Sequence, residues 1–173
     1  ASLLSWAGGI LFSIFMIFQI VGFMTKSKDV EQSNSIAVFP FENILKNEEF
    51  NWLSDGFSRT MTFKISEIEK LNVIDQLQIL KTIEKVQPKG AGMAYDVIAR
   101  KTAEKMNINF FISGSYQIHD DKIQITAQLV NVQSGVSKPL AMKTYPLSDL
   151  IQLQTDISQE ISTILNSNKY FND

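Results

Sequence analysis

The chain has 173 residues, of which 45% are hydrophobic and 20% are charged, a composition typical of one globular domain with an appendage. Its formal net charge of -2 argues against nucleic acid as a partner, because nucleic-acid binding draws its affinity from clustered Lys and Arg side chains. The sequence contains no cysteine, which excludes disulfides, thiolate metal sites and cysteine nucleophiles.

Residues 1–25 are predicted to form a transmembrane helix. The run from Leu3 to Met24 has no charged residue, and a helix of that length crosses the roughly 30 Å hydrocarbon core of a bilayer. Ser5, Gly9 and Ser13 recur at every fourth position, a spacing that lets another membrane helix approach closely. Because Gly and Ser are common in membrane helices anyway, a packing stripe and ordinary membrane-helix composition both remain open.

The orientation of this helix rests on two opposing observations. Lys26 and Lys28 follow it in a polar linker, residues 26–34, and the positive-inside rule then favours a cytoplasmic domain. The chain begins with Ala1 and not with Met, so we expect either processing or a longer parent protein, whose upstream residues would change that charge balance.

The domain itself is predicted to span residues 35–166. Ile36–Phe41 reads as a buried strand that Pro40 ends, and Glu42–Asn47 reads as a turn. Asn47 is then a candidate N-cap, with two glutamates after it in the dipole-favoured first turn. The following apolar residues have helical spacing: Phe50, Leu53, Phe57, Met61, Ile65 and Ile68.

Three further elements follow before the longest strands. Leu71–Ile74 is a predicted strand, and Asp75 is positioned to cap a helix. Gln87–Gly92 breaks that helix, and another is expected from Ala94 to Met106, ended by Asn107. The residues expected to face the core are Leu77, Leu80 and Ile83 in the first helix and Val97, Ile98 and Ala103 in the second.

The remaining sequence predicts a β-meander and a helix. Phe110–Ile118 and Lys122–Val132 alternate apolar and polar residues around a polar turn, which is typical of a hairpin with one covered and one polar face. Ser134 and Gly135 turn the chain into a third strand, Leu140–Tyr145. Ser148 is expected to cap the last helix, with a frayed tail at residues 167–173; its apolar positions are Leu150, Leu153, Ile157, Ile161 and Ile164.

The predicted fold class is therefore α/β, a mixed sheet with packed helices in βαβααβββα order, preceded by one transmembrane helix. Four blocks resemble the TolB amino-terminal-like domain, a module found downstream of a membrane helix in many bacterial signalling proteins. These blocks are Ser35–Ile44, Trp52–Met61, Leu71–Asp75 and Ile108–Gly135. The resemblance implies a non-catalytic, usually extracytoplasmic domain used for protein contacts, and it carries no catalytic residues. No tetratricopeptide array or β-propeller follows it here.

Candidate sites are few. His119, with Asp120 and Asp121 beside it, fits a hairpin turn better than a metal site, which needs several convergent ligands. Gly90–Gly92 lacks the Lys-Ser/Thr of a phosphate loop and reads as a linker. Gly56, inside a predicted helix, indicates close packing against the sheet or a local break, and we favour close packing.

The remaining acidic pairs and serines add no catalytic set. Glu48/Glu49 and Glu67/Glu69 fit exposed helix faces, while Ser54, Ser58 and Ser115 lack a nearby base. The sequence predicts no cofactor and no enzyme.

We therefore expect a single-pass protein of the bacterial inner membrane with a periplasmic domain that contacts another membrane protein or complex. One alternative is the sensory part of a larger membrane signalling protein, a cyclase, kinase or winged-helix regulator whose effector domain precedes Ala1. A small-molecule ligand between the sheet and the helices is a further alternative, for which the sequence offers only the fold.

Overall fold

The computed structural model describes residues 34–69, 71–87 and 92–167, all within the second of the two units into which the chain divides, Asn34–Asp173. The predicted transmembrane helix Leu3–Met24 lies outside the described residues. Within the part that is described, no helix combines the length and the apolar character that a membrane span requires.

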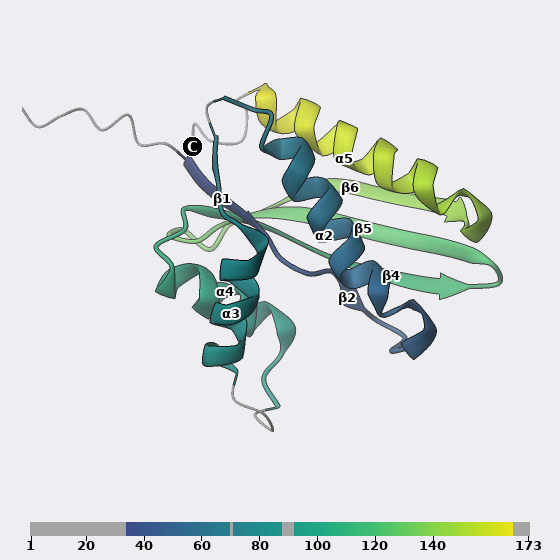
Figure 1. The fold of residues 1–173 in the computed structure, drawn as a ribbon, viewed down its shortest axis with the longest axis horizontal. Helices are drawn as coiled ribbons and strands as arrows, with labels where there is room; N and C mark the ends of the chain where they lie inside the picture. The colour runs from purple at the N-terminus through teal and green to yellow at the C-terminus, as the bar shows by residue number, and fades with distance from the viewer. Residues whose placement is uncertain (1–33, 70, 88–91, 168–173) are drawn as a thin grey trace, which may run out of the picture. The chain divides into compact units, whose positions relative to one another are not determined.

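A six-stranded mixed sheet forms the centre of this unit. Five strands lie in the order β3-β1-β4-β5-β6, and β2 pairs with β4. The strands β1, β3 and β4 run parallel, while β4, β5 and β6 form an antiparallel meander (Figure 1). The described order confirms the predicted mixed α/β fold. The strand bounds are β1 Asn34–Val38, β2 Glu42–Asn43, β3 Leu71–Val73, β4 Phe110–His119, β5 Lys122–Asn131 and β6 Ser137–Pro146.

β1 ends at Val38, before the predicted end at Phe41, and a second short strand follows where the sequence predicted a turn. Glu42 and Asn43 form β2 and pair with Ser115 and Tyr116 of β4, so the predicted turn over Glu42–Asn47 is wrong at its start. β1 and β2 lie along the same side of β4, separated by a break at Pro40, which has no N–H to donate to a ladder. The sequence showed the break but not the resumed pairing, which depends on the distant strand β4.

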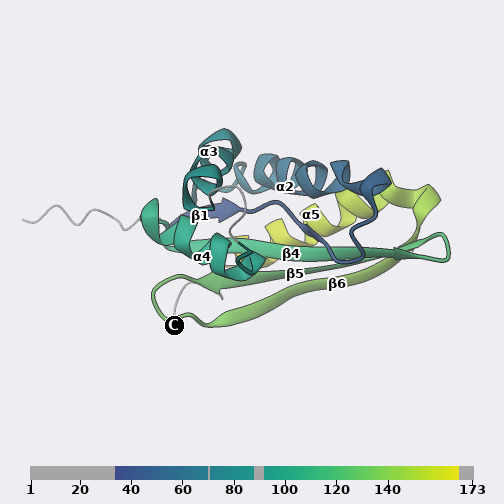
Figure 2. The ribbon, with the colours of Figure 1, turned by 90° about the horizontal axis from the view of Figure 1, so that it is seen from below.

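Helices α2 (Trp52–Ile65) and α5 (Leu150–Asn166) cover one face of the sheet (Figures 1 and 2). Their apolar positions meet the alternate residues of the strands, and this explains why β5 buries every second side chain. The main core on this face includes Ile36 and Val38 of β1, Ile112 and Tyr116 of β4, Ile123, Ile125 and Leu129 of β5, Leu53, Phe57 and Met61 of α2, and Leu153, Ile157 and Ile161 of α5.

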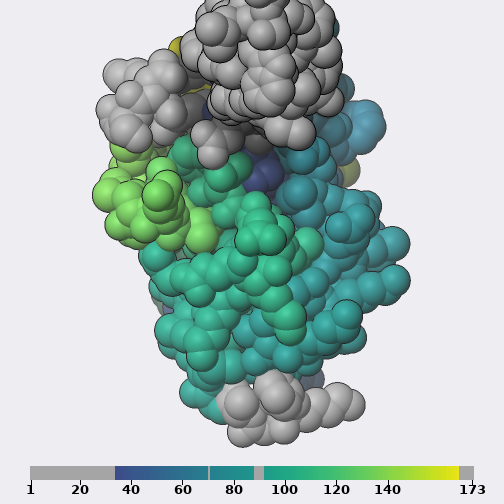
Figure 3. Space-filling view, turned by 90° about the vertical axis from the view of Figure 1, so that its left-hand side faces the viewer, coloured from purple at the N-terminus to yellow at the C-terminus, as the bar shows by residue number. Residues whose placement is uncertain are grey.

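Helices α3 (Gln76–Val86) and α4 (Tyr95–Lys105) cover only part of the opposite face. They lie side by side (Figure 3), at the end of the sheet where β1 begins (Figure 1). Phe39 and Phe111 meet there edge to face, with ring centroids 5.2 Å apart. The smaller core on this face contains Ala37, Phe39, Ile79, Ala99, Ala103, Ile108, Phe111 and Val130. The rest of that face, toward the β4–β5 turn, has no described helix over it (Figure 2).

The inward faces of α3 and α4 differ from the prediction. In α3, Ile79 is fully buried and Leu77 is 55% exposed, so placing Leu77 in the core was wrong. The reason is Gln76, whose amide donates to the buried Ser58 hydroxyl at 2.9 Å. This hydrogen bond orients α3 so that the side chains of Gln76 and Ile79 face the core. In α4, Ile98 and Ala103 are buried as predicted, while Val97 is exposed.

The predicted helix caps have mixed outcomes. Asp75 caps α3 as predicted, because its carboxylate accepts from the N–H groups of Leu77 and Gln78. Asn47 also caps, but it caps a short 3-10 turn, Glu48–Phe50, and α2 starts after it. Ser148 does not cap α5: it lies in a second 3-10 turn, Leu147–Asp149, and its hydroxyl donates to Asp149.

Candidate functional site

The candidate site is the part of the sheet that α3 and α4 leave uncovered, which we call the open face. It carries Ser115 and Gln117 from β4 and Gln124, Thr126 and Gln128 from β5, which alternate with the buried residues of the main core. Ser113 of β4 lies on the same side of the sheet but is buried. The predicted division into a covered face and a polar face is confirmed by this burial pattern.

Polar side chains on the open face pair with one another across the strands. The hydroxyls of Ser115 and Thr126 lie 2.9 Å apart, and Gln117 donates to Gln124 at 2.5 Å. Gln128 donates to Ser113 at 3.2 Å and accepts from Ser137 of β6 at 2.6 Å. Because these groups already have protein partners, covering them costs less free energy than covering unpaired polar groups. The open face is therefore suited to contact by another surface.

A groove of about 320 Å³ lies on this face, between the N-terminal end of α4 and β6. Its floor contains Ser113, Ser115 and Thr126. Ile44, which follows β2, and Met142 of β6 line it and are 47% and 70% exposed. The groove thus combines a hydroxyl-rich floor with one exposed apolar side chain from β6 and one from the segment that follows β2.

Tyr95, the first residue of α4, also lines the groove. Its hydroxyl donates to the carbonyl oxygen of Pro40, which joins α4 to the break between β1 and β2. Burial raises the pKa of Tyr95, and the negative charges of Glu42, Asp96 and Asp55 raise it further. The tyrosine therefore stays neutral and keeps its donated hydrogen bond at physiological pH.

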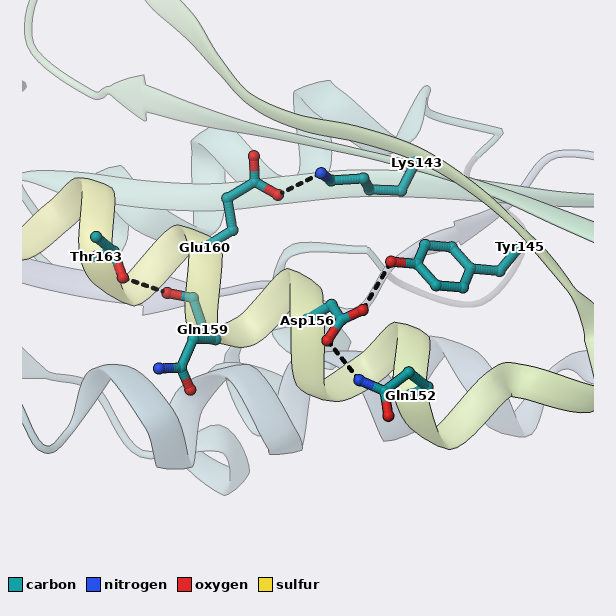
Figure 4. Close-up of polar contacts among 7 residues, drawn as sticks. All are labelled: Lys143, Tyr145, Gln152, Asp156, Gln159, Glu160 and Thr163. Atoms are coloured by element: carbon teal, nitrogen blue, oxygen red, sulfur yellow. Dashed lines mark hydrogen bonds and ion pairs between the residues drawn. The ribbon is translucent and has the colours of Figure 1, made fainter.

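A second polar set joins β6 to α5 on the covered side (Figure 4). Tyr145 donates to Asp156 at 2.7 Å, and Gln152 of α5 donates to the other carboxylate oxygen at 2.7 Å. Lys143 forms an ion pair with Glu160 at 3.1 Å. The hydrogen bond to Asp156 raises the pKa of Tyr145, and the hydrogen bond to Glu160 raises the pKa of Lys143. These contacts hold β6, the last strand of the sheet, against α5.

The residues singled out from the sequence do not form a catalytic site. His119 lies at the end of β4, and its Nε2 is 3.2 Å from Asp120, with both side chains 83% exposed. Asp120 and Asp121 form the turn itself with positive φ. Among the described residues, no group of three or more His, Cys, Asp or Glu side chains is placed to hold a metal.

The predicted serine and glycine positions have structural contacts. Ser54 donates to the carbonyl of Phe41 at 2.6 Å, and Ser58 accepts from Gln76. Gly56 lies in α2, where an added Cβ would be 3.3 Å from Gln154 of α5. Close approach is therefore to a helix and not to the sheet. Of Gly90–Gly92, only Gly92 is described. Of the predicted acidic pairs, Glu67 forms an ion pair with Lys64 at 3.8 Å.

Ser5, Gly9 and Ser13 lie outside the described residues, so their predicted packing role stays a prediction. Sequence reasoning missed Ile44, Tyr95 and Met142, which three different elements bring to one groove. The available signal was the polar alternation of β5, which indicated an open face but not its borders.

The mixed α/β fold is similar to several solved bacterial structures. TolB from Acinetobacter baumannii is 18% identical, with 79% of this chain and 29% of that chain covered and a TM-score of 0.49. A PelC dodecamer variant from Paraburkholderia phytofirmans is 16% identical, with 75% of this chain and 86% of that chain covered and a TM-score of 0.47. The LpoB C-terminal domain from Salmonella enterica is 14% identical, with coverages of 72% and 90% and a TM-score of 0.39.

TolB is thus among the structures that this chain resembles, as the sequence blocks predicted. The chain spans 29% of the length of that TolB chain. No protein-family model and no curated protein matches the sequence.

Proposed function

We propose that this chain is a non-catalytic accessory subunit that binds another membrane protein through the open face of its α/β domain. The observation that carries the proposal is the uncovered part of the sheet, where internally paired polar groups lie beside the exposed Ile44 and Met142. A surface with satisfied polar groups and a few exposed apolar side chains loses little on desolvation and gains from apolar burial.

The proposal includes a single-pass membrane anchor and a periplasmic location for the domain. It is supported by the uncharged run Leu3–Met24 and by the resemblance of the sequence blocks to an extracytoplasmic module. Reporter fusions after Asp173 test the location: alkaline phosphatase activity is expected, and green fluorescence instead would contradict a periplasmic domain.

Site-specific photocrosslinking tests the contact surface in intact cells. A benzophenone amino acid at Met142, on the open face, is expected to give a covalent adduct of higher mass. The matched control is the same amino acid at Gln78, which is exposed on α3. If Met142 gives no adduct and the chain extracted in mild detergent is a lone monomer, the proposed function is wrong.

A further inference from the structure

The charged residues that line the groove on the open face are both acidic. Glu42 lies in β2 and Asp96 in the first turn of α4, so two elements distant in sequence place their carboxylates at one groove. Both side chains are exposed, and neither forms an ion pair with another described residue. No ion pair among the described residues therefore neutralises these two carboxylates.

Tyr95 lies beside these carboxylates and is held in place by its hydrogen bond to Pro40. Glu42, Asp96 and Asp55 all act on its hydroxyl in the same direction, and no described cation opposes them there. A fixed aromatic ring next to carboxylates is a favourable environment for a cationic side chain, because the ring quadrupole and the negative charges attract it together.

Ile44 and Met142 add apolar area at the same groove. Met142 has a flexible, polarizable side chain that adapts to different apolar partners. An occupant that satisfies all these groups needs a cation and an apolar side chain close together.

We propose that the groove binds a basic segment of the partner protein, in which a lysine or arginine side chain lies beside an apolar one. This inference rests on the proposed function and names the chemistry of the partner. The cation pairs with Glu42 and Asp96 near Tyr95, and the apolar side chain contacts Ile44 and Met142. A second copy of this chain is a poor occupant, because a two-fold contact through the open face brings Glu42 and Asp96 of both copies together.

The test is methyl NMR on the full chain in lipid nanodiscs, with labelled Ile and Met methyl groups. The probes are two synthetic five-residue peptides, one alternating valine and arginine and one alternating valine and glutamate. The arginine peptide is expected to shift the methyl resonances of Ile44 and Met142, and the glutamate peptide is not. Equal shifts with both peptides, or none with either, would overturn the proposal.

Two double variants assign the effect to the carboxylates. Glu42→Gln with Asp96→Asn is expected to weaken binding of the arginine peptide about tenfold, the effect of losing charge-assisted contacts. Glu84→Gln with Glu104→Gln removes the same charge from exposed positions on α3 and α4 and is expected to leave binding unchanged. Equal loss in both variants would indicate an effect of net charge and would overturn the groove assignment.

Three further outcomes distinguish this inference from its alternatives. The single variant Glu42→Gln leaves Asp96, in the first turn of α4, unchanged. It is expected to weaken binding of the arginine peptide without changing the melting temperature of the chain. Methyl shifts that depend on protein concentration without peptide would indicate a second copy in the groove and contradict the proposal. If Met142 still crosslinks to a partner while the arginine peptide fails to bind, the proposed function stands and this inference alone is wrong.

Discussion

Gly114 is the position in β4 where a side chain has no room. A Cβ there would lie 2.1 Å from Cε1 of Phe41 and 2.4 Å from the carbonyl oxygen of Thr126. The ring of Phe41 occupies this space and also contacts Phe57, with ring centroids 5.8 Å apart. Gly114 thus leaves room for the Phe41 ring, which follows the break between β1 and β2.

Replacing Gly114 by alanine is therefore expected to lower the free energy of unfolding by about 3 kcal/mol, because buried Phe41 and the β5 backbone must both move. Urea denaturation measures this. The matched control is Gly56→Ala, where the nearest atom is the end of the flexible Gln154 side chain. The higher helix propensity of alanine then outweighs the tight contact, and the free energy of unfolding is expected to rise by about 0.5 kcal/mol. Similar effects at both glycines would contradict the close packing at Gly114.

Tyr95 gives the domain a predicted sensitivity to alkaline pH. Its pKa in the folded state is raised above the ordinary value of 10.0, so the folded state holds this proton more tightly than the unfolded state. The associated stability is fully present below pH 10 and is lost as the pH rises further. We expect the urea midpoint to fall above pH 10, and to fall less steeply in Tyr95→Phe. An unchanged slope in that variant would show that Tyr116, Tyr145 or Lys143, whose pKa values are also raised, dominate the effect.

Between elements, β6 and α5 depend on each other through Tyr145, Asp156, Lys143 and Glu160. Tyr145→Phe and Asp156→Ala are each expected to lower the urea midpoint slightly, and the double variant by less than the sum, because both remove the same hydrogen bond. The pair Lys143→Met and Glu160→Gln serves as the comparison, and its effect is expected to vanish at high salt. Strict additivity for Tyr145 and Asp156 would contradict their contact.

The sequence predicted elements well where the signal is local. The β4–β5 hairpin follows from strict alternation around Asp120 and Asp121, and the Asp75 cap follows from a side chain two and three residues from its partners. The prediction of which α3 residues face the core was wrong because that face depends on a contact distant in sequence. That face depends on Gln76 reaching Ser58, eighteen residues earlier, and apolar spacing alone cannot show that contact.

The site was less predictable than the fold. The polar alternation of β5 indicated an open face, but the groove also needs β2, which pairs with β4 only after the break at Pro40. It further needs the N-terminal end of α4, which Tyr95 joins to Pro40 across 55 positions of sequence. Contacts of this kind arise from packing and leave no periodic pattern in the sequence.

Across the sheet, stability is expected to differ between strands. β4 pairs with β5 along its whole length and with β1 and β2 over parts of its other side, and it contributes to both cores, whereas β3 has three residues and one neighbour. Hydrogen exchange should therefore be slowest at the amides of β4 and β5 and faster at those of β3. Mass spectrometry of peptides from the full chain measures this order, and the slowest exchange in β3 would contradict it.

β1 begins and α5 ends at the same end of the sheet. Asn34 pairs with Leu71, and Asn166 lies at a groove with Ile68 and Glu69, just before that strand. The turn at Asp120 and Asp121 lies at the other end of β4. A circular permutant that joins Asn166 to Asn34 by a short linker and opens the chain between Asp120 and Asp121 would keep every strand pair in register. The same arrangement in space is thus compatible with a different order of elements along the chain. Termini that lie close together also suit insertion of the domain into a loop of a host protein.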